Sequence, residues 1–253
     1  MNPYTKNLNR LEFLITLACT GRCIHCSEGD HDGCHISIDA DAAASLVTKV
    51  AANYNIQSLM TFGGEPMLHP ETVYAIHRAA RDAGIPKRQI ITNGFFSRDE
   101  HVIRSAAQRL ADSGVNDILL SADAFHQETI PLAPVKIFAD ALLRAGGAVR
   151  MNPAWLVSRS ADNPYNRKTR EILAEFTDMG IPVGKGNVIF PSGNALKYLA
   201  DYFDPDNLPV NPYEESPDDV RTVSVEPDGS VLGGNIYDTD ILTLIERYTP
   251  SAG

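Results

Sequence analysis

Four glycines at nearly equal intervals limit the fold of this chain more than any other feature. Each follows a segment with helical hydrophobic spacing, and the successive intervals are 30, 32 and 34 residues. The four are Gly84, Gly114, Gly146 and Gly180. A glycine accepts the left-handed backbone conformation that ends a helix and turns the chain. One interval is the length of a helix, a strand and two short loops, so the pattern predicts β/α units with parallel strands and right-handed crossovers.

Six apolar runs rich in valine, isoleucine and leucine are expected to form the strands. They are 11–17, 56–62, 87–92, 117–121, 148–157 and 183–190. Eight strands are needed to close a full barrel, and an open doubly wound sheet has the same alternation. The periodicity alone therefore leaves both architectures open.

Capping signals predict where several helices begin. Asp39 can cap a first helix, and Pro70 and Pro164 suit first helical positions. Ser97 and Glu100 form a capping-box pattern before a further helix. The starts at Pro70, Ser97 and Pro164 agree with helical segments that three of the glycines end.

The pattern changes after residue 190. Residues 191–219 are rich in proline, aspartate and asparagine and are expected to be irregular. Residues 222–225 and 230–232 flank Pro-Asp-Gly, which predicts a hairpin, and a short helix is expected over roughly 240–247. We expect residues 1–195 to form a core domain and residues 196–253 to form a small extension packed on it.

Composition excludes some classes of function. The 253 residues carry a formal net charge of −10, which argues against nucleic acid as a partner. Charged residues interrupt every apolar run before 18 residues, and residues 1–10 lack the apolar core of a signal peptide. We therefore expect a cytoplasmic protein without a membrane partner.

All four cysteines lie within sixteen residues, unlike a disulfide framework spread over a domain. Cys19, Cys23 and Cys26 follow the first predicted strand, at spacings that let three thiolates converge on one metal centre. A closed zinc site or a closed four-thiolate cluster has four ligands. The spacing thus indicates an open coordination position, unless His25, Cys34 or His35 completes the set. A structural zinc site and unrelated free thiols stay open as alternatives.

A second motif, Gly63-Gly64-Glu65-Pro66, follows the second predicted strand. Paired glycines let the backbone approach a ligand closely, and the proline keeps Glu65 extended. Such a segment can direct its carbonyl groups at an ammonium group. A plain turn between strand and helix is the alternative.

Together, Cys-x3-Cys-x2-Cys and Gly-Gly-Glu-Pro resemble the motifs of the radical S-adenosylmethionine (SAM) superfamily. Residues 91–94 (Ile-Thr-Asn-Gly) and 121–126 (Ser-Ala-Asp-Ala-Phe-His) are similar to that family's third and fourth strand ends, and the resemblance covers residues 10–195. It implies an α/β fold, a partial TIM-like barrel of six β/α units. It also implies a [4Fe–4S] cluster on the three cysteines, with SAM on the fourth iron. The cofactor then supplies a 5′-deoxyadenosyl radical that removes a hydrogen atom from the substrate.

The resemblance also implies roles for individual residues. The Gly-Gly-Glu-Pro segment should hold the SAM ammonium group, and His25 should lie near the adenine. Four strand-end residues are candidates for contacts to the ribose or carboxylate of SAM, with capping of the next turn as their alternative. His126 can line the substrate pocket and Cys34 can return a hydrogen atom, although a surface histidine and an inert thiol are the alternatives. The cofactor-binding candidates are His25, Gly63, Gly64, Glu65, Pro66, Asn93, Ser121, Asp123 and Asn152.

The chain departs from peptide-modifying relatives near its end. Residues 223–234 are similar to the hairpin that opens their cysteine-rich extension, but Gly233 and Gly234 stand where those relatives have cysteine. The extension is therefore expected to be a degenerate remnant, and the enzyme to use one cluster. Residues 193–195 read Gly-Asn-Ala where some relatives have Gly-Arg-Ala.

The expected function is that of an enzyme acting on a peptide or a small molecule, with electrons from a flavodoxin or ferredoxin. Two alternatives remain. One is an activase that installs a glycyl radical on a partner protein. The other is a non-catalytic zinc- or cluster-binding module.

Overall fold

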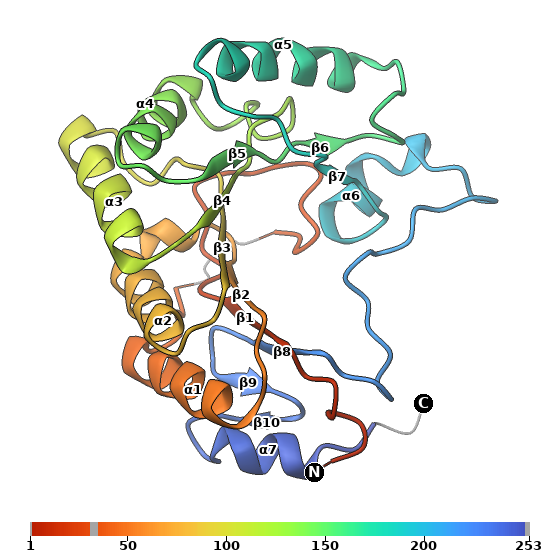
Figure 1. Cartoon of the computed structure of the whole chain (residues 1–253). Coiled ribbons are helices and arrows are strands. Elements are labelled where there is room, and N and C mark those ends of the chain that lie inside the picture. The colour runs from red at the N-terminus through yellow and green to blue at the C-terminus, as the bar shows by residue number, and fades with distance from the viewer. Residues whose placement is uncertain (1, 31–34, 251–253) are drawn as a thin grey trace.

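A parallel sheet of six strands forms the centre of the molecule (Figure 1). The computed structural model describes residues 2–30 and 35–250. The strand order is β5-β4-β3-β2-β1-β8, and every neighbouring pair is parallel. The strands are β1 (Arg10–Leu14), β2 (Ser58–Phe62), β3 (Lys87–Thr92), β4 (Asp117–Leu120), β5 (Val149–Met151) and β8 (Thr222–Val225).

Helices cover one side of this sheet. Figure 1 shows α1 to α4 side by side along the outside of the curved sheet, with α5 beyond them. They are α1 (Ala40–Asn53), α2 (Pro70–Asp82), α3 (Glu100–Ser113), α4 (Leu132–Arg144) and α5 (Pro164–Asp178). The four predicted stop glycines all have positive φ, between 74° and 92°, just after these helices. The predicted partial barrel is thus confirmed as an open α/β sheet.

The predicted capping box before α3 is wrong. Asp99, not Ser97, is the N-cap, and its carboxylate accepts from the amides of His101 and Val102. Ser97 accepts a hydrogen bond from the Asp99 amide instead. A carboxylate next to the first turn satisfies two free amides and interacts favourably with the helix dipole.

The fifth and sixth predicted strands are also rearranged. The run 148–157 is divided at Pro153, which lacks an amide to donate, into β5 and β6 (Ala154–Trp155). The run 183–190 forms a bridge from Val183 to Met151, and β7 (Asn187–Val188) pairs with β6 in parallel. This segment continues the curvature beyond β5, while the sixth place in the main sheet belongs to β8.

The predicted hairpin over 222–232 needs correction as well. β8 joins the main sheet beside β1, and the antiparallel pair is β9 (Ser230–Val231) with β10 (Gly234–Asn235). The Pro-Asp-Gly turn does form, since the Glu226 amide donates to Ser230 across it. The remaining elements are the short helices η1 (Pro66–Leu68), η2 (Ala200–Tyr202), α6 (Gly193–Tyr198) and α7 (Ile241–Arg247).

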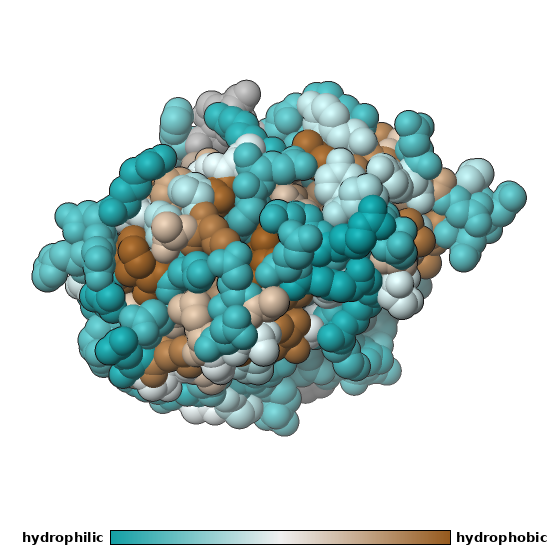
Figure 2. All heavy atoms as spheres, turned by 90° about the horizontal axis from the view of Figure 1, so that it is seen from above, coloured by the Kyte–Doolittle hydropathy of each residue, from teal (hydrophilic) through white to brown (hydrophobic). Residues whose placement is uncertain are grey.

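The strands of the main sheet carry completely buried side chains at the centre of the core. Leu11, Leu59, Ile90 and Ile118 are completely buried, one on each of the first four strands. Seen from the side where α5 lies, the visible face is mostly hydrophilic, and hydrophobic groups appear mainly between polar ones (Figure 2). Among the described residues, no helix is both long and apolar enough to cross a membrane.

His77, on α2, should make the protein acid-sensitive. Its Nε2 lies 3.0 Å from the Thr61 hydroxyl, its Nδ1 has no partner, and burial lowers its pKa to about 3. A histidine with a lowered folded pKa stabilises the fold above pH 6.5, and this contribution is lost as the pH falls. His77→Gln should remove it, so the stability difference between wild type and variant should shrink by about 2 kcal/mol from pH 7 to pH 5.

Urea unfolding at both pH values measures this difference. His101→Gln, on exposed α3 surface, is the matched control and should follow the wild type. A His77→Gln profile parallel to the wild type would show that His77 does not carry the acid sensitivity.

Candidate active site

The cysteine loop follows β1 and is held by the segment that follows β2. The Gly64 amide donates to Thr16 at 2.8 Å, and the Glu65 amide donates to Ala18 at 2.8 Å. These bonds extend the β1–β2 pairing beyond the strand ends. The two motifs recognised in the sequence therefore form one structural unit.

Close backbone approach explains both glycines of this unit. A Cβ on Gly63 would lie 2.5 Å from the Thr16 carbonyl oxygen. A Cβ on Gly64 would lie 2.5 Å from the Leu17 oxygen and would also collide with the Ala18 oxygen. The obstacle in each case is backbone, so no side-chain movement relieves it. In the structure the glycines admit the cysteine loop, and their predicted contact with SAM stays a prediction.

Gly64→Ala should therefore displace the cysteine loop. We expect destabilisation by about 2 kcal/mol or more, in the range of overpacked cores, together with reduced iron binding. Gly84→Ala is the control, because its Cβ meets no atom within 4 Å and only left-handed strain of about 1 kcal/mol is added. Thermal unfolding and iron analysis compare the two. Equal losses in both variants would contradict the steric explanation.

The three thiols lie in one partly buried group. Burial raises the pKa of Cys19 to about 11 and also raises the pKa values of Cys23 and Cys26. Cys19 and Cys26 each raise the pKa of Cys23 further, because neighbouring thiolates disfavour its ionisation. Without a metal the thiols stay protonated, whereas a bound metal deprotonates coordinating thiols outright. Three soft donors on one loop fit an iron–sulfur cluster.

Glu65 is completely buried beside this loop. Its Oε1 accepts from the Met67 amide at 2.9 Å and the Thr92 hydroxyl at 2.7 Å, and its Oε2 accepts from the Asn93 amide at 2.8 Å. All three donors are neutral, and burial raises the pKa of Glu65 to about 7. The ionised form of a buried carboxylate that is held only by neutral donors is stabilised by a nearby cation. The ammonium group of SAM is such a cation.

The predicted strand-end residues lie at the carboxyl ends of β3, β4 and β5, along the same edge of the sheet. Asn93 Nδ2 lies 3.6 Å from Cys19 Sγ, while its Oδ1 caps a turn at the Phe95 amide. The Ser121 amide donates to Thr92, and the Asn152 amide donates to Leu120. Asn93 is thus beside a cluster cysteine, and the predicted SAM contacts of the set stay predictions.

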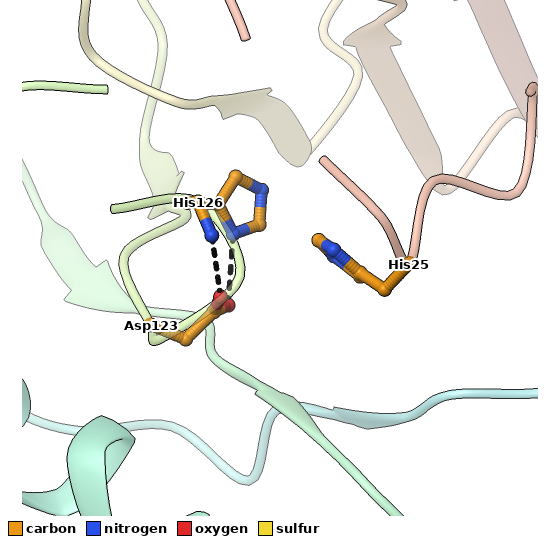
Figure 3. A group of neighbouring side chains, drawn as sticks. All are labelled: His25, Asp123 and His126. Carbon is orange, nitrogen blue, oxygen red and sulfur yellow. Dashed lines mark hydrogen bonds and ion pairs between the residues drawn. The ribbon is translucent and has the colours of Figure 1, made fainter. Parts of the chain in front are cut away.

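Asp123, His126 and His25 form a cluster between the loop after β4 and the cysteine loop (Figure 3). The Asp123 carboxylate accepts from the amides of Phe125, His126 and Ala154, and its Oδ2 lies 2.9 Å from His126 Nδ1. Although burial opposes ionisation, the neighbouring His126 lowers the pKa of Asp123 below its ordinary value. Asp123 therefore caps its turn, which was the alternative to a SAM contact, and orients His126.

His25 reaches this cluster from the cysteine motif. Its ring lies 4.8 Å from that of His126 and 5.0 Å from that of Phe125, measured between centroids. Burial lowers its pKa to about 4, and its buried Nδ1 has no hydrogen-bond partner in the described structure. A neutral, flat ring with an unsatisfied nitrogen suits contact with a heteroaromatic ligand such as adenine.

The three side chains can also be compared with a metal site, since their ligand atoms lie within 4.8 Å of one another. The four hydrogen bonds of Asp123 occupy its carboxylate, and His126 Nδ1 is already oriented by it. The carboxylate is therefore a support for His126 rather than a free ligand.

The sequence did not reveal the contribution of α6. Asn194 bonds to two cysteine residues of the motif through its amide and side chain. The one signal in the sequence is Gly-Asn-Ala at 193–195, where some relatives have Gly-Arg-Ala. This difference alone does not indicate a contact with the cysteine loop. Cys34 lies outside the described residues, so its predicted catalytic role has no structural test.

Three partly buried thiols on the loop after the first strand of an open parallel β/α sheet are the arrangement expected of an iron–sulfur enzyme of the partial-barrel class. The model of the radical SAM superfamily matches residues 13–150, more than half of the chain, and the protein belongs to this superfamily. It is therefore an enzyme of a family that uses a [4Fe–4S] cluster and SAM.

Among curated proteins, the chain is similar to a probable GTP 3′,8-cyclase of Saccharolobus islandicus, with 26% identity over 219 residues. This alignment covers 81% of the chain and 67% of the relative. A GTP 3′,8-cyclase of Desulforamulus reducens is 25% identical over 131 residues, covering 51% of the chain and 38% of that protein.

Two solved structures share the fold. Native anSMEcpe with bound AdoMet has a TM-score of 0.59 at 18% identity, covering 94% of this chain and 80% of that one. Streptococcus suis SuiB bound to precursor peptide SuiA has a TM-score of 0.60 at 15% identity, covering 97% of this chain and 66% of SuiB.

Proposed function

We propose that this enzyme cleaves SAM reductively at a single [4Fe–4S] cluster on Cys19, Cys23 and Cys26. The observation that carries the proposal is the hydrogen-bonded unit of the two motifs, which places three thiols and the buried Glu65 carboxylate in one site. The cofactor pair supplies a 5′-deoxyadenosyl radical, which removes a hydrogen atom from a peptide or small-molecule substrate.

The chain's own residues position and enclose this chemistry. Thr92 and the amides of Met67 and Asn93 fix Glu65, so its carboxylate is preorganised for the SAM ammonium group. We propose that the adenine ring of SAM contacts the His25 ring, whose Nδ1 has no hydrogen-bond partner in the described structure. His126, oriented by Asp123, is a candidate substrate-contacting residue.

An open surface hollow of about 260 Å³ lies next to the loop after β4, and we propose it as a place for a small substrate group. It is lined by residues of that loop and of α5, including Gln127, Glu128 and Lys168. Tyr165, which also lines it, stacks on Phe125 at 4.7 Å, and Phe125 in turn contacts His25. The GTP 3′,8-cyclases among the relatives make a nucleotide the first small molecule to test.

Further proposals concern the surroundings of the site. The residues of this sequence after Cys34 include no cysteine and so offer no thiolate to an auxiliary cluster. We propose that residues 196–253 are a remnant of a cysteine-rich extension, with the β9–β10 hairpin at the position of its opening. We also propose a cytoplasmic enzyme reduced by a flavodoxin or ferredoxin.

Anaerobic reconstitution tests the proposed function. The protein should be brown and contain about four irons per chain, as expected for one [4Fe–4S] cluster. With SAM and dithionite it should form 5′-deoxyadenosine and methionine, measured by liquid chromatography and mass spectrometry. A colourless zinc protein, or a cluster-bearing protein that binds SAM but never cleaves it, would overturn the proposal.

A further inference from the structure

The first residues of α6 are bonded to the cysteine loop from across the molecule. The Asn194 amide donates to the Cys26 oxygen at 2.9 Å, and Asn194 Nδ2 donates to the Cys23 oxygen at 3.3 Å. The Ser192 hydroxyl donates to the Ser27 oxygen at 3.1 Å. Asn194 is 7% exposed, so its own two bonds to the loop are largely shielded from water, whereas the Ser192 bond is exposed.

Gly193 brings the two segments into contact. A Cβ at this position would lie 2.6 Å from the Cys26 oxygen and 2.7 Å from the Gly29 nitrogen, and φ is +48°. Only glycine accommodates both the approach and this backbone conformation without displacement. The contact is thus made by backbone against backbone, with the Asn194 side chain adding a second bond.

The contact joins opposite ends of the fold. Asn194 and Cys23 are 171 residues apart in sequence. The cysteine loop leaves β1, whereas α6 follows β7, which extends the curved sheet beyond β5 (Figure 1). The loop is therefore held both by the Gly-Gly-Glu-Pro segment after β2 and by the first residues of α6.

We propose that Asn194 is a positioning residue for the iron–sulfur cluster, acting through the carbonyl groups of Cys23 and Cys26. The inference rests on the proposed cluster. Fixing the peptide groups of Cys23 and Cys26 also fixes the directions in which the two cysteine side chains leave the backbone. The two thiolates are therefore oriented toward the cluster position before iron binds. Supporting residues behind metal ligands typically change metal affinity 10- to 100-fold when they are removed.

Asn194→Leu tests this, because leucine has similar size but cannot donate to the Cys23 oxygen. Leu196→Ala, on the exposed face of the same helix, is the matched control. Both reconstituted variants are compared with wild type for iron release to a chelator without substrate. We expect release about tenfold faster or more from Asn194→Leu, and wild-type release from Leu196→Ala.

The electron paramagnetic resonance spectrum of the reduced cluster is the second readout, since a merely structural role would not alter it. We expect changed line shape in Asn194→Leu only. Wild-type release and spectrum in a folded Asn194→Leu protein would overturn the inference. If that variant does not fold, the smaller change Asn194→Ala decides: iron release faster than from Leu196→Ala supports the positioning role of Asn194, and equal release overturns it.

Failure of this inference is distinct from failure of the proposed function. If wild-type protein binds no cluster or does not cleave SAM, the proposed function fails. If wild-type protein does both and Asn194→Leu behaves like it, only the role of Asn194 fails.

Discussion

Cys23→Ala should abolish cluster assembly: we expect the reconstituted variant to be colourless and its 5′-deoxyadenosine formation to fall to background. The motif supplies three thiolate ligands, so the substitution leaves only two of them for the cluster. Of the three motif cysteines, Cys23 is the least exposed, at 9%, and its carbonyl oxygen accepts a hydrogen bond from the Asn194 side chain. Iron and sulfide analysis, visible absorption and product analysis measure the loss.

Cys34→Ala is the matched control for this prediction. It lies outside the three-cysteine motif, so the variant should keep the wild-type iron content. Circular dichroism establishes that both variants are folded. A brown Cys23→Ala protein that still cleaves SAM would contradict the assigned ligand set, and loss of iron in Cys34→Ala would add a fourth ligand.

The first four strands were predictable because each is an apolar run followed by a helix, and in three of the four units a stop glycine ends that helix. The run 222–225 was also predicted as a strand, but its place beside β1 was not, although Val223 and Val225 are completely buried. Its local signal, Pro-Asp-Gly, correctly indicates a turn, but parallel pairing with β1 joins residues more than two hundred positions apart. Such a long-range pairing leaves no periodic pattern in either segment. The sequence therefore favours the nearby run 230–232 as the partner of 222–225.

The candidate site also has a part that the sequence predicts and a part that only the fold reveals. Cysteine spacing and the Gly-Gly-Glu-Pro motif identify groups that are close in sequence and brought together by one strand pairing. The support that Asp123 gives His126 depends on a turn, and also on the amide of Ala154 from another strand. The bonds of Asn194 depend on the completed sheet. Residues that act through tertiary contacts carry no motif of their own, and their chemistry becomes visible only in the fold.

Glu65→Gln should reduce both SAM binding and stability. One amide oxygen can keep two of the three hydrogen bonds, but the amide nitrogen then faces the Asn93 N–H at the position of Oε2. A buried donor left without an acceptor costs about 1–3 kcal/mol. The variant should also lose the anionic partner proposed for the SAM ammonium group, so its affinity for SAM should fall.

The stability difference should depend on pH, and its sign follows from the pKa of about 7. A carboxylate with a raised folded pKa contributes fully below its unfolded value of about 4.5, and this contribution is lost as the pH rises through 7. Wild type should therefore lose about 2.5 kcal/mol relative to Glu65→Gln between pH 5 and pH 8 in the metal-free protein. Urea unfolding at the two pH values measures this change. Glu171→Gln, on the exposed face of α5, should follow the wild type at both. A Glu65→Gln deficit that stays constant or grows with pH would mean that the buried carboxylate is already ionised at pH 5, so that its environment is more polar than the fold implies.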